Sequence, residues 1–510
     1  MSETRTSDRH GRRAGPAARL YPRLIARLAA LTGLFLLGLA LAPPTPTAAA
    51  IEVGAAEDLV RSAVFADSKA QFELAASAGL TVVRMTALWE PGLAEPDERT
   101  VALYRNTARA AALTGIRLMV AVYPKDSRSV PLDETSRAEF ASYVGGLARA
   151  VPELRSFIVG NEPNLNFFWL PQYDLDGTSA APRAYVDLLA TMYDALKAVS
   201  PDISVIGGAL SPAGTDKASG KRPSHSPGAF ILGMGEAYRA LARGLPIMDQ
   251  FAFHPYGETS KSPPTAEHPN STRISLADYG KLVSFLGRAF DGTAQPGTSL
   301  PLVYDEYGVQ SAIPASKHGL YTNQSSPGAA DAIDEATQAL YYRQALQIAA
   351  CQPNVKAFLI FHTVDEPNLR RWQSGLFYPD LTPKTSFALV RRSVLQARGG
   401  KLTSCSVEPA PIELLELLFP QEPRIPAGNR DWRILAGCAS SCVYAASLVQ
   451  LPAGEVVVSG SGFLSGGAVR TIKLRSVQVP PGLYRLTVRL FPASGLADPI
   501  YGTSRPLKVG

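Results

Sequence analysis

The chain has 510 residues, of which 46% are hydrophobic and 18% are charged, a composition typical of a globular protein rather than a disordered one. Its net charge of +6 comes mostly from residues 1–50, which contain seven Arg and two acidic residues, whereas the remainder carries 43 basic and 42 acidic side chains, a charge of +1. This near-neutral balance argues against nucleic acid or an anionic membrane surface as a partner.

The N-terminal segment has the order of regions that is typical of a secretory signal. Its basic residues precede the uncharged run Leu28–Ala42, after which residues 43–50 are rich in Pro and Ala. Fifteen apolar residues are short for a bilayer span of ~20. We therefore predict a signal peptide over residues 1–50, cleaved near Ala50, and a protein that is secreted or held in the cell envelope. It would be membrane-bound only if this segment were retained as an anchor.

From residue 51, short apolar runs alternate with helical patterns. Eight runs predict strands, at Ile51–Ala56, Thr81–Thr86, Arg117–Tyr123, Ser156–Asn161, Ile203–Gly208, Asp249–His254, Leu302–Glu306 and Ala357–His362. Helices are predicted between them, among others at residues 69–78, 102–114, 182–199, 275–290 and 335–350. Eight strands that strictly alternate with helices favour a closed parallel barrel over an open sheet. We predict an α/β fold with a (β/α)8 TIM barrel over residues 51–402.

The pattern changes after residue 402. Residues 403–426 are rich in proline and predict a stiff linker, whose apolar residues 414–419 are expected to pack on a domain face. Beyond it the apolar residues alternate, as at Tyr484, Leu486 and Val488. We predict a small antiparallel β-sandwich, similar to an immunoglobulin domain, over residues 427–510. Scattered aromatic residues favour a packing or spacer role for it over glycan binding.

All four cysteines follow the leader, and an even number in an exported chain predicts two disulfides. We pair Cys351 with Cys405 and Cys438 with Cys442, although the last two could also form a metal or redox pair. The six histidines lack metal-ligand spacing, and the chain has neither a Gly-x-Ser-x-Gly elbow nor a phosphate-binding glycine loop. We expect no metal and no cofactor, and no esterase or nucleotide chemistry.

Two glutamates stand at the ends of predicted strands four and seven. Glu162 follows Ser156–Asn161, and Glu306 ends Leu302–Glu306. In an eight-stranded barrel these strand ends lie across the central cavity, at the face where barrels carry their chemistry. Two carboxylates that flank one bond can hydrolyse a glycosidic linkage with retention when they are roughly 5–5.5 Å apart. The alternative is a pair of carboxylates that form salt bridges with barrel arginines.

Other predicted strand ends supply possible companions for the two glutamates. Arg84 could keep a nucleophilic carboxylate ionised, or it could form an ion pair at the barrel mouth. His254 and Tyr256 could line the cleft, with the tyrosine hydrogen-bonded to the same carboxylate, or they could hold a loop. His362 leaves strand eight, where it lines the cleft or has a structural role.

Residues 51–398 resemble the large clan of retaining glycoside hydrolases that are built on a TIM barrel, in which Asn-Glu closes strand four and a glutamate closes strand seven. The resemblance implies that Glu162 is the general acid/base, Glu306 the nucleophile, and Asn161 the amide that hydrogen-bonds the sugar hydroxyl next to the anomeric carbon. Within this clan the chain is most similar to secreted bacterial glycosidases of the cellulase and β-xylosidase-like families.

The chain departs from this clan at strand eight, where many members place a tryptophan early and this chain has His362. Trp372, Trp89 and Trp169 are the candidates for a sugar-stacking surface, although the last two could instead cap a core. The resulting prediction is a secreted, metal-independent retaining glycosidase that forms a covalent intermediate on Glu306, acts on a carbohydrate substrate and has no obligate protein partner. A catalytically inactive carbohydrate-binding or cell-envelope protein and a transglycosidase are the alternatives.

Overall fold

The computed structural model describes residues 48–324, 331–402, 405, 412–420, 424–426, 428, 430–476, 479–492 and 499–510. Of the predicted signal peptide, residues 1–47 lie outside this range. Ala48 is buried in the core of the barrel, and the Ala49 N–H donates to the Ala350 carbonyl over 2.9 Å. The barrel therefore includes Ala48 and Ala49, slightly before the cleavage position predicted near Ala50. No helix among the described residues is long and apolar enough to cross a bilayer.

Eight parallel strands close into a barrel in chain order, with β8 pairing with β1, which confirms the predicted TIM barrel. The strands are β1 (Glu52–Ala56), β2 (Val82–Trp89), β3 (Arg117–Pro124), β4 (Ser156–Val159), β5 (Ser204–Leu210), β6 (Gln250–Phe253), β7 (Leu302–Tyr307) and β8 (Val355–Phe361). The helices are α2 (Phe65–Ser77), α3 (Glu98–Thr114), α4 (Glu134–Ala150), α5 (Ala181–Val199), α6 (Pro227–Ala240), α7 (Tyr279–Phe290), α8 (Glu335–Ala350) and α9 (Phe387–Arg398), with 3-10 turns η1 (Leu276–Asp278) and η2 (Ala315–Leu320).

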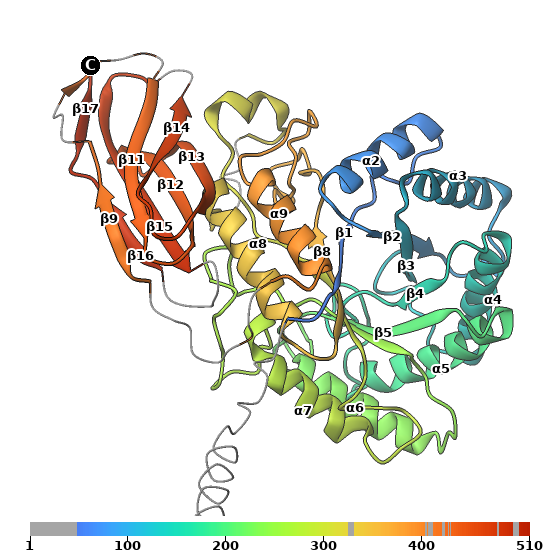
Figure 1. Cartoon of the computed structure of the whole chain (residues 1–510). Coiled ribbons are helices and arrows are strands. Elements are labelled where there is room, and N and C mark those ends of the chain that lie inside the picture. The colour runs from blue at the N-terminus through green and yellow to red at the C-terminus, as the bar shows by residue number, and fades with distance from the viewer. Residues whose placement is uncertain are drawn as a thin grey trace, which may run out of the picture. The chain divides into compact units, whose positions relative to one another are not determined.

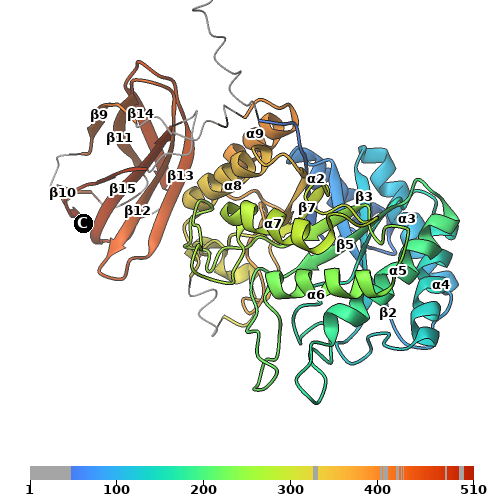
Figure 2. The same cartoon turned by 90° about the horizontal axis from the view of Figure 1, so that it is seen from below.

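The helices lie around the outside of the strands, as Figure 1 and the view from below in Figure 2 show. Local signals set their ends. The Asp97 side chain accepts from the Thr100 N–H at the start of α3, and Gly115 ends this helix at a φ of 70°, a conformation that glycine adopts without strain.

Alternate residues of each strand face either the barrel axis or the helices. In β3, Met119 and Ala121 belong to the inner cluster of the barrel, whereas Val120 belongs to the cluster shared with the helices. In β2, Val82 is also in the inner cluster, so Arg84 two residues later points to the same side. The predicted end of this strand was too early, because β2 continues to Trp89.

A break in the register of β7 changes this alternation beside the site. The pairing of β7 with β8 shifts between Tyr304 and Tyr307, while Val303 faces the inner cluster and Tyr304 the outer one. Such irregularities re-aim side chains next to active sites. Here two consecutive acidic residues, Asp305 and Glu306, both reach ion-pairing distance of Arg84, which lies inside the barrel.

The C-terminal region consists of two sheets around their own apolar core, in which Trp432 is 2% exposed. One sheet has the order β10 (Arg424–Ile425), β17 (Leu507–Val509), β15 (Gly482–Pro492), β12 (Cys442–Leu451) and β13 (Val456–Leu464), with β16 (Ile500–Thr503) also paired to β15. The other has the order β14 (Arg470–Ser476), β11 (Arg430–Cys438) and β9 (Leu414–Leu418). These sheets confirm the predicted β domain.

The β domain includes part of the segment that was predicted to be a linker. Leu414–Leu418 forms β9 and pairs with β11, and Arg424–Ile425 pairs with Lys508 and Val509 of β17. The predicted boundary at residue 427 was therefore too late, because apolar residues in a proline-rich stretch can still complete a sheet edge. Both predicted disulfides are present, Cys351–Cys405 and Cys438–Cys442.

Candidate active site

Glu162 stands on a strained turn at the end of β4. Its φ of 41° lies in the left-handed region, which costs a non-glycine residue about 1–3 kcal/mol. The turn is held by hydrogen bonds from the Glu162 N–H to the Ala209 carbonyl over 2.8 Å and from the Leu165 N–H to the Glu162 carbonyl over 2.9 Å. The strained backbone at Glu162 thus fixes its carboxylate at the mouth of the barrel. The Glu162 side chain is 17% exposed.

The Glu306 carboxylate is held by two donors, one on each oxygen. Arg84 Nη1 donates to Oε1 over 2.6 Å, and the Tyr256 hydroxyl donates to Oε2 over 3.0 Å. Burial, together with Glu306 and Glu162, raises the pKa of Tyr256 well above its ordinary value, so the phenol keeps its proton and remains a donor. The second terminal nitrogen of Arg84, Nη2, donates to Asn161 Oδ1 over 2.6 Å. With its oxygen held by Arg84, Asn161 has its NH2 group left as a donor toward the cleft.

His254 lies beneath the two glutamates and is completely buried. Its Nδ1 is 3.1 Å from Glu162 Oε1 and 3.5 Å from Glu306 Oε2, and its Nε2 is 3.3 Å from Asp305 Oδ1. Asp305 is also completely buried, and its Oδ2 is 3.3 Å from Arg84 Nε. Together these side chains form one cluster in which acidic and basic groups alternate. We call this set, Arg84, Glu162, His254, Asp305 and Glu306, the carboxylate cluster.

The charges of this cluster fix the protonation of its buried members. Burial alone would lower the pKa of His254, but the carboxylates of Glu306 and Asp305 outweigh it and raise the pKa to about 10. Burial would raise the pKa of Asp305, but His254 and Arg84 lower it below its ordinary value. At neutral pH, His254 is therefore a cation and Asp305 an anion. The stability that this histidine contributes is fully present below pH ~6.5 and is lost as the pH rises through about 10.

We expect the His254 ring to remain an imidazolium up to about pH 9, because the Asp305 and Glu306 carboxylates and the Glu162 side chain surround it. NMR spectra of protein labelled with 15N-histidine should show both of its ring nitrogens at imidazolium chemical shifts across this range. The signals are assigned by their absence in the His254→Gln variant. Asp305→Asn should move the titration midpoint of His254 downward, and a midpoint near 6.5 in the wild type would refute the charge assignment.

A cleft of about 610 Å³ opens above the carboxylate cluster and reaches Glu162 and Glu306. His362 lies in its wall, and its Nδ1 must carry the proton because it bonds the Ala56 carbonyl over 2.7 Å. His362 Nε2 lies 3.9 Å from Glu366 Oε2, which also lines the cleft. Trp372 is half-exposed in the same wall, with its ring 5.2 Å from that of Tyr256. The Trp372 side chain thus offers a flat apolar face beside the two carboxylates.

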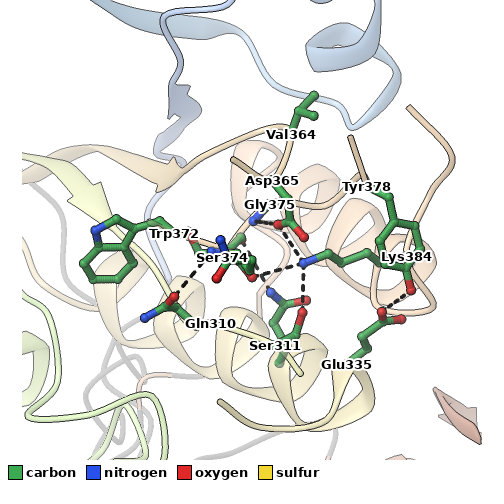
Figure 3. A network of polar contacts seen from close by, with 12 residues as sticks. Gln310, Ser311, Glu335, Val364, Asp365, Trp372, Ser374, Gly375, Tyr378 and Lys384 are labelled. Atoms are coloured by element: carbon green, nitrogen blue, oxygen red, sulfur yellow. Dashed lines mark hydrogen bonds and ion pairs between the residues drawn. The ribbon is translucent and has the colours of Figure 1, made fainter. Parts of the chain in front are cut away.

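The loop after β8, which carries Trp372, is anchored by a buried ion pair between Lys384 and Asp365 (Figure 3). Lys384 Nζ donates to Asp365 Oδ1 and to Ser311 Oγ, each over 2.8 Å, and to the Gln373 carbonyl over 3.1 Å. Neither Lys384 nor Asp365 exposes its side chain. Asp365 Oδ2 accepts from the Tyr321 hydroxyl over 2.6 Å. Two segments of the loop are thereby fixed on either side of Trp372.

The structure corrects three of the predicted substrate contacts. Trp89 is 0% exposed and stacks on Phe140 at 4.8 Å, and Trp169 is 1% exposed and packs against Tyr185 at 5.8 Å, so neither lines the cleft. Both belong to the shell between strands and helices, where a large aromatic ring fills the core. His254 lies behind the carboxylates and contacts Glu162 instead of the cleft. Its role is to position acidic side chains.

The chain matches no profile of a known protein family, and it matches no characterised protein sequence. Among solved structures, an endo-β-1,4-mannanase from Thermotoga petrophila aligns over 90% of this chain and 98% of its own, at 12% identity and a TM-score of 0.45. A monomeric β-xylosidase from Caulobacter crescentus aligns over 88% and 98% at 16% identity and a TM-score of 0.44.

A GH5_18 protein from Streptomyces cattleya, in complex with GlcNAc, aligns over 74% of this chain and 84% of its own at 16% identity and a TM-score of 0.48. Likenesses at these identities and TM-scores do not transfer an activity.

Several residues of the site had not been predicted from the sequence. Asp305 directly precedes Glu306, and in a regular strand the two side chains would lie on opposite faces. Phe167 and Phe168 line the cleft beyond Glu162, and Glu57 and Tyr123 line it near the ends of β1 and β3. Glu57 directly follows β1, whereas Tyr123 lies within β3 and the two phenylalanines stand several residues beyond β4, so position after a strand points only to Glu57. Among the described residues, no group of three His, Cys, Asp or Glu side chains could hold a metal ion.

Proposed function

We propose that this protein is a retaining glycosidase that hydrolyses O-glycosidic bonds by double displacement. One observation carries the proposal: Glu162 and Glu306 share His254 Nδ1, at 3.1 and 3.5 Å, at the floor of one cleft. A common neighbour this close is compatible with the separation of roughly 5–5.5 Å between the two carboxyl groups that retention requires.

In the first step, a Glu306 oxygen attacks the anomeric carbon while Glu162 gives its proton to the leaving oxygen. The bond to the leaving group breaks, and a glycosyl ester forms on Glu306. In the second step, Glu162 takes a proton from a water molecule, which attacks the anomeric carbon and releases Glu306. Asn161 donates from its NH2 group to the hydroxyl next to the anomeric carbon, because its oxygen is already engaged by Arg84.

The charge balance of the carboxylate cluster supports this division of roles. With the proton on Glu162, the cluster contains the anions Asp305 and Glu306 and the cations Arg84 and His254, and it is neutral. Buried charges that balance in pairs are far less costly than an unpaired one. Glu306 is the glutamate that forms an ion pair with Arg84, and we therefore assign it as the attacking group.

We further propose that the protein works outside the cytoplasm. Both disulfides are formed, as is usual in oxidising compartments, and the sequence of residues 1–50 has the features of a secretory signal. The N-terminal residue of protein recovered from the culture medium tests this, and recovery of the chain only from the cytosol would refute it.

The function is tested by following the hydrolysis of an aryl-glycoside and oligosaccharide panel by NMR. The first product released should keep the anomeric configuration of the substrate. An inverted product would refute the nucleophilic role of Glu306. Glycan binding without release of any sugar would make the chain a carbohydrate-binding protein, and transfer to an added acceptor in place of water would make it a transglycosidase.

The Glu162→Gln variant should separate the two steps. Its kcat on substrates with poor leaving groups should fall by about 10²–10⁴-fold, the usual contribution of a general acid, whereas formation of the glycosyl enzyme from a dinitrophenyl glycoside needs no proton. Azide attacks without a general base, so it should restore turnover of the dinitrophenyl substrate and give a glycosyl azide of retained configuration. Absence of azide rescue would contradict the role of Glu162.

A further inference from the structure

A second hollow, of about 980 Å³, adjoins the cleft. The loops after β3, β4 and β5 form it, and it shares Tyr123, Phe167, Phe168 and Ser211 with the cleft. Loops at the carboxyl ends of adjacent barrel strands build the substrate sites of this fold. The second hollow is therefore placed to hold the part of a glycan chain that lies beyond the bond to be cleaved.

The charged side chains around this hollow are mostly cationic. Lys125, Asp126, Lys221 and Arg222 line it. Lys125 is already neutralised, because its Nζ lies 2.7 Å from Glu90 Oε1. Within the described part of the chain, neither Lys221 nor Arg222 forms an ion pair, and both are exposed. The Asp126 carboxylate also has no ion pair among the described residues and accepts from the Ser129 hydroxyl over 2.6 Å, so the two cations leave the hollow with a net positive charge, in a protein whose charge beyond residue 50 is only +1.

An exposed aromatic side chain lies where the two hollows meet. Phe167 lines both of them and is 75% exposed, and its ring packs edge-on against Phe168 with centroids 4.9 Å apart. The face of the Phe167 ring suits the apolar face of a sugar ring, and the neighbouring Phe168 limits its motion.

We propose that this hollow, the basic groove of Phe167, Lys221 and Arg222, binds an anionic segment of a glycan chain. Phe167 would stack on a sugar ring, and Lys221 and Arg222 would bind carboxylate or sulfate groups on the following sugars, for which a guanidinium offers a paired set of donors. The substrate of the proposed glycosidase is then an acidic polysaccharide. This last statement rests on the proposed function, whereas binding in the groove does not.

The test uses the mature protein and compares its binding of charged and neutral forms of the same oligosaccharide. Oligogalacturonate and oligomannuronate are each paired with their carboxyl-reduced counterparts, and sulfated forms of the reduced chains distinguish sulfate from carboxylate. By calorimetry, the wild type should bind a charged form about tenfold more tightly than its neutral counterpart. The Lys221→Gln/Arg222→Gln variant should lose this preference, and high salt should weaken it.

Lys217→Gln is the matched control, because Lys217 is exposed on the same loop but does not line the groove. It should keep the preference. The proposal that the basic groove binds an anionic glycan is wrong if the wild type binds charged and neutral forms equally, or binds neither. It is also wrong if the double variant keeps the full preference for the charged form.

Turnover of the same pairs distinguishes failure of this inference from failure of the proposed function. If the wild type hydrolyses charged and neutral chains with equal kcat/KM, the acidic substrate is wrong and the glycosidase stands. If no chain is hydrolysed but charge-selective binding is present and is lost in the double variant, the basic groove stands and the glycosidase fails.

Discussion

The Glu306→Ala variant should lose at least about 10³-fold in kcat on an aryl glycoside, because it removes the carboxylate that we propose to form the covalent intermediate. Glu306 is the residue that both Arg84 Nη1 and the Tyr256 hydroxyl orient, at 2.6 and 3.0 Å. Removal of the carboxylate leaves room for a small anion in its place. Added azide should then displace the leaving group directly, in one step.

The stereochemistry of this azide product separates the two glutamates. A single displacement in Glu306→Ala inverts the anomeric centre, whereas the Glu162 variant should give the retained glycosyl azide. Glu258→Ala is a suitable control, because Glu258 follows Tyr256 closely but is exposed and does not line the cleft. Wild-type turnover in Glu306→Ala, or the same azide anomer from both variants, would refute the assignment of the nucleophile.

The Lys384→Met variant should lower the free energy of unfolding by about 3–5 kcal/mol, the usual effect of removing one partner from a buried ion pair. Lys384 has no exposed side chain, and its loss leaves Asp365 as an unpaired carboxylate whose pKa burial already raises. Urea unfolding measures the change. The second substitution Asp365→Asn should recover part of it, because it removes the unpaired charge.

This ion pair should also affect the cleft, since it anchors the loop that carries Trp372 (Figure 3). In Lys384→Met we expect faster tryptic cleavage after the exposed Arg370 and Arg371, and a lower kcat/KM. Lys317→Met is the comparison, because Lys317 pairs with Asp380 at the surface, where such pairs contribute about 0–1 kcal/mol. If Lys384→Met and Lys317→Met lose equal amounts of unfolding free energy and of kcat/KM, burial of the Lys384 ion pair has no special effect.

The sequence determined the barrel and the two facing glutamates, because these depend on local signals. Branched apolar runs form strands and amphipathic runs form helices. The order of eight such pairs fixes which strand ends face each other, so Glu162 and Glu306 were assigned to strands four and seven without any knowledge of contacts. The even number of cysteines behind a predicted secretory signal likewise predicted two disulfides, and both are present.

Only the tertiary structure decided which neighbours of those glutamates reach the cleft. A register shift in β7 brings Asp305 into the carboxylate cluster beside Glu306, and packing against α4 and α5 buries Trp89 and Trp169. Each outcome depends on pairs far apart in the chain, such as Arg84 and Glu306, which are separated by 222 positions. Burial and register arise from such distant contacts, and the local pattern of side chains does not record them.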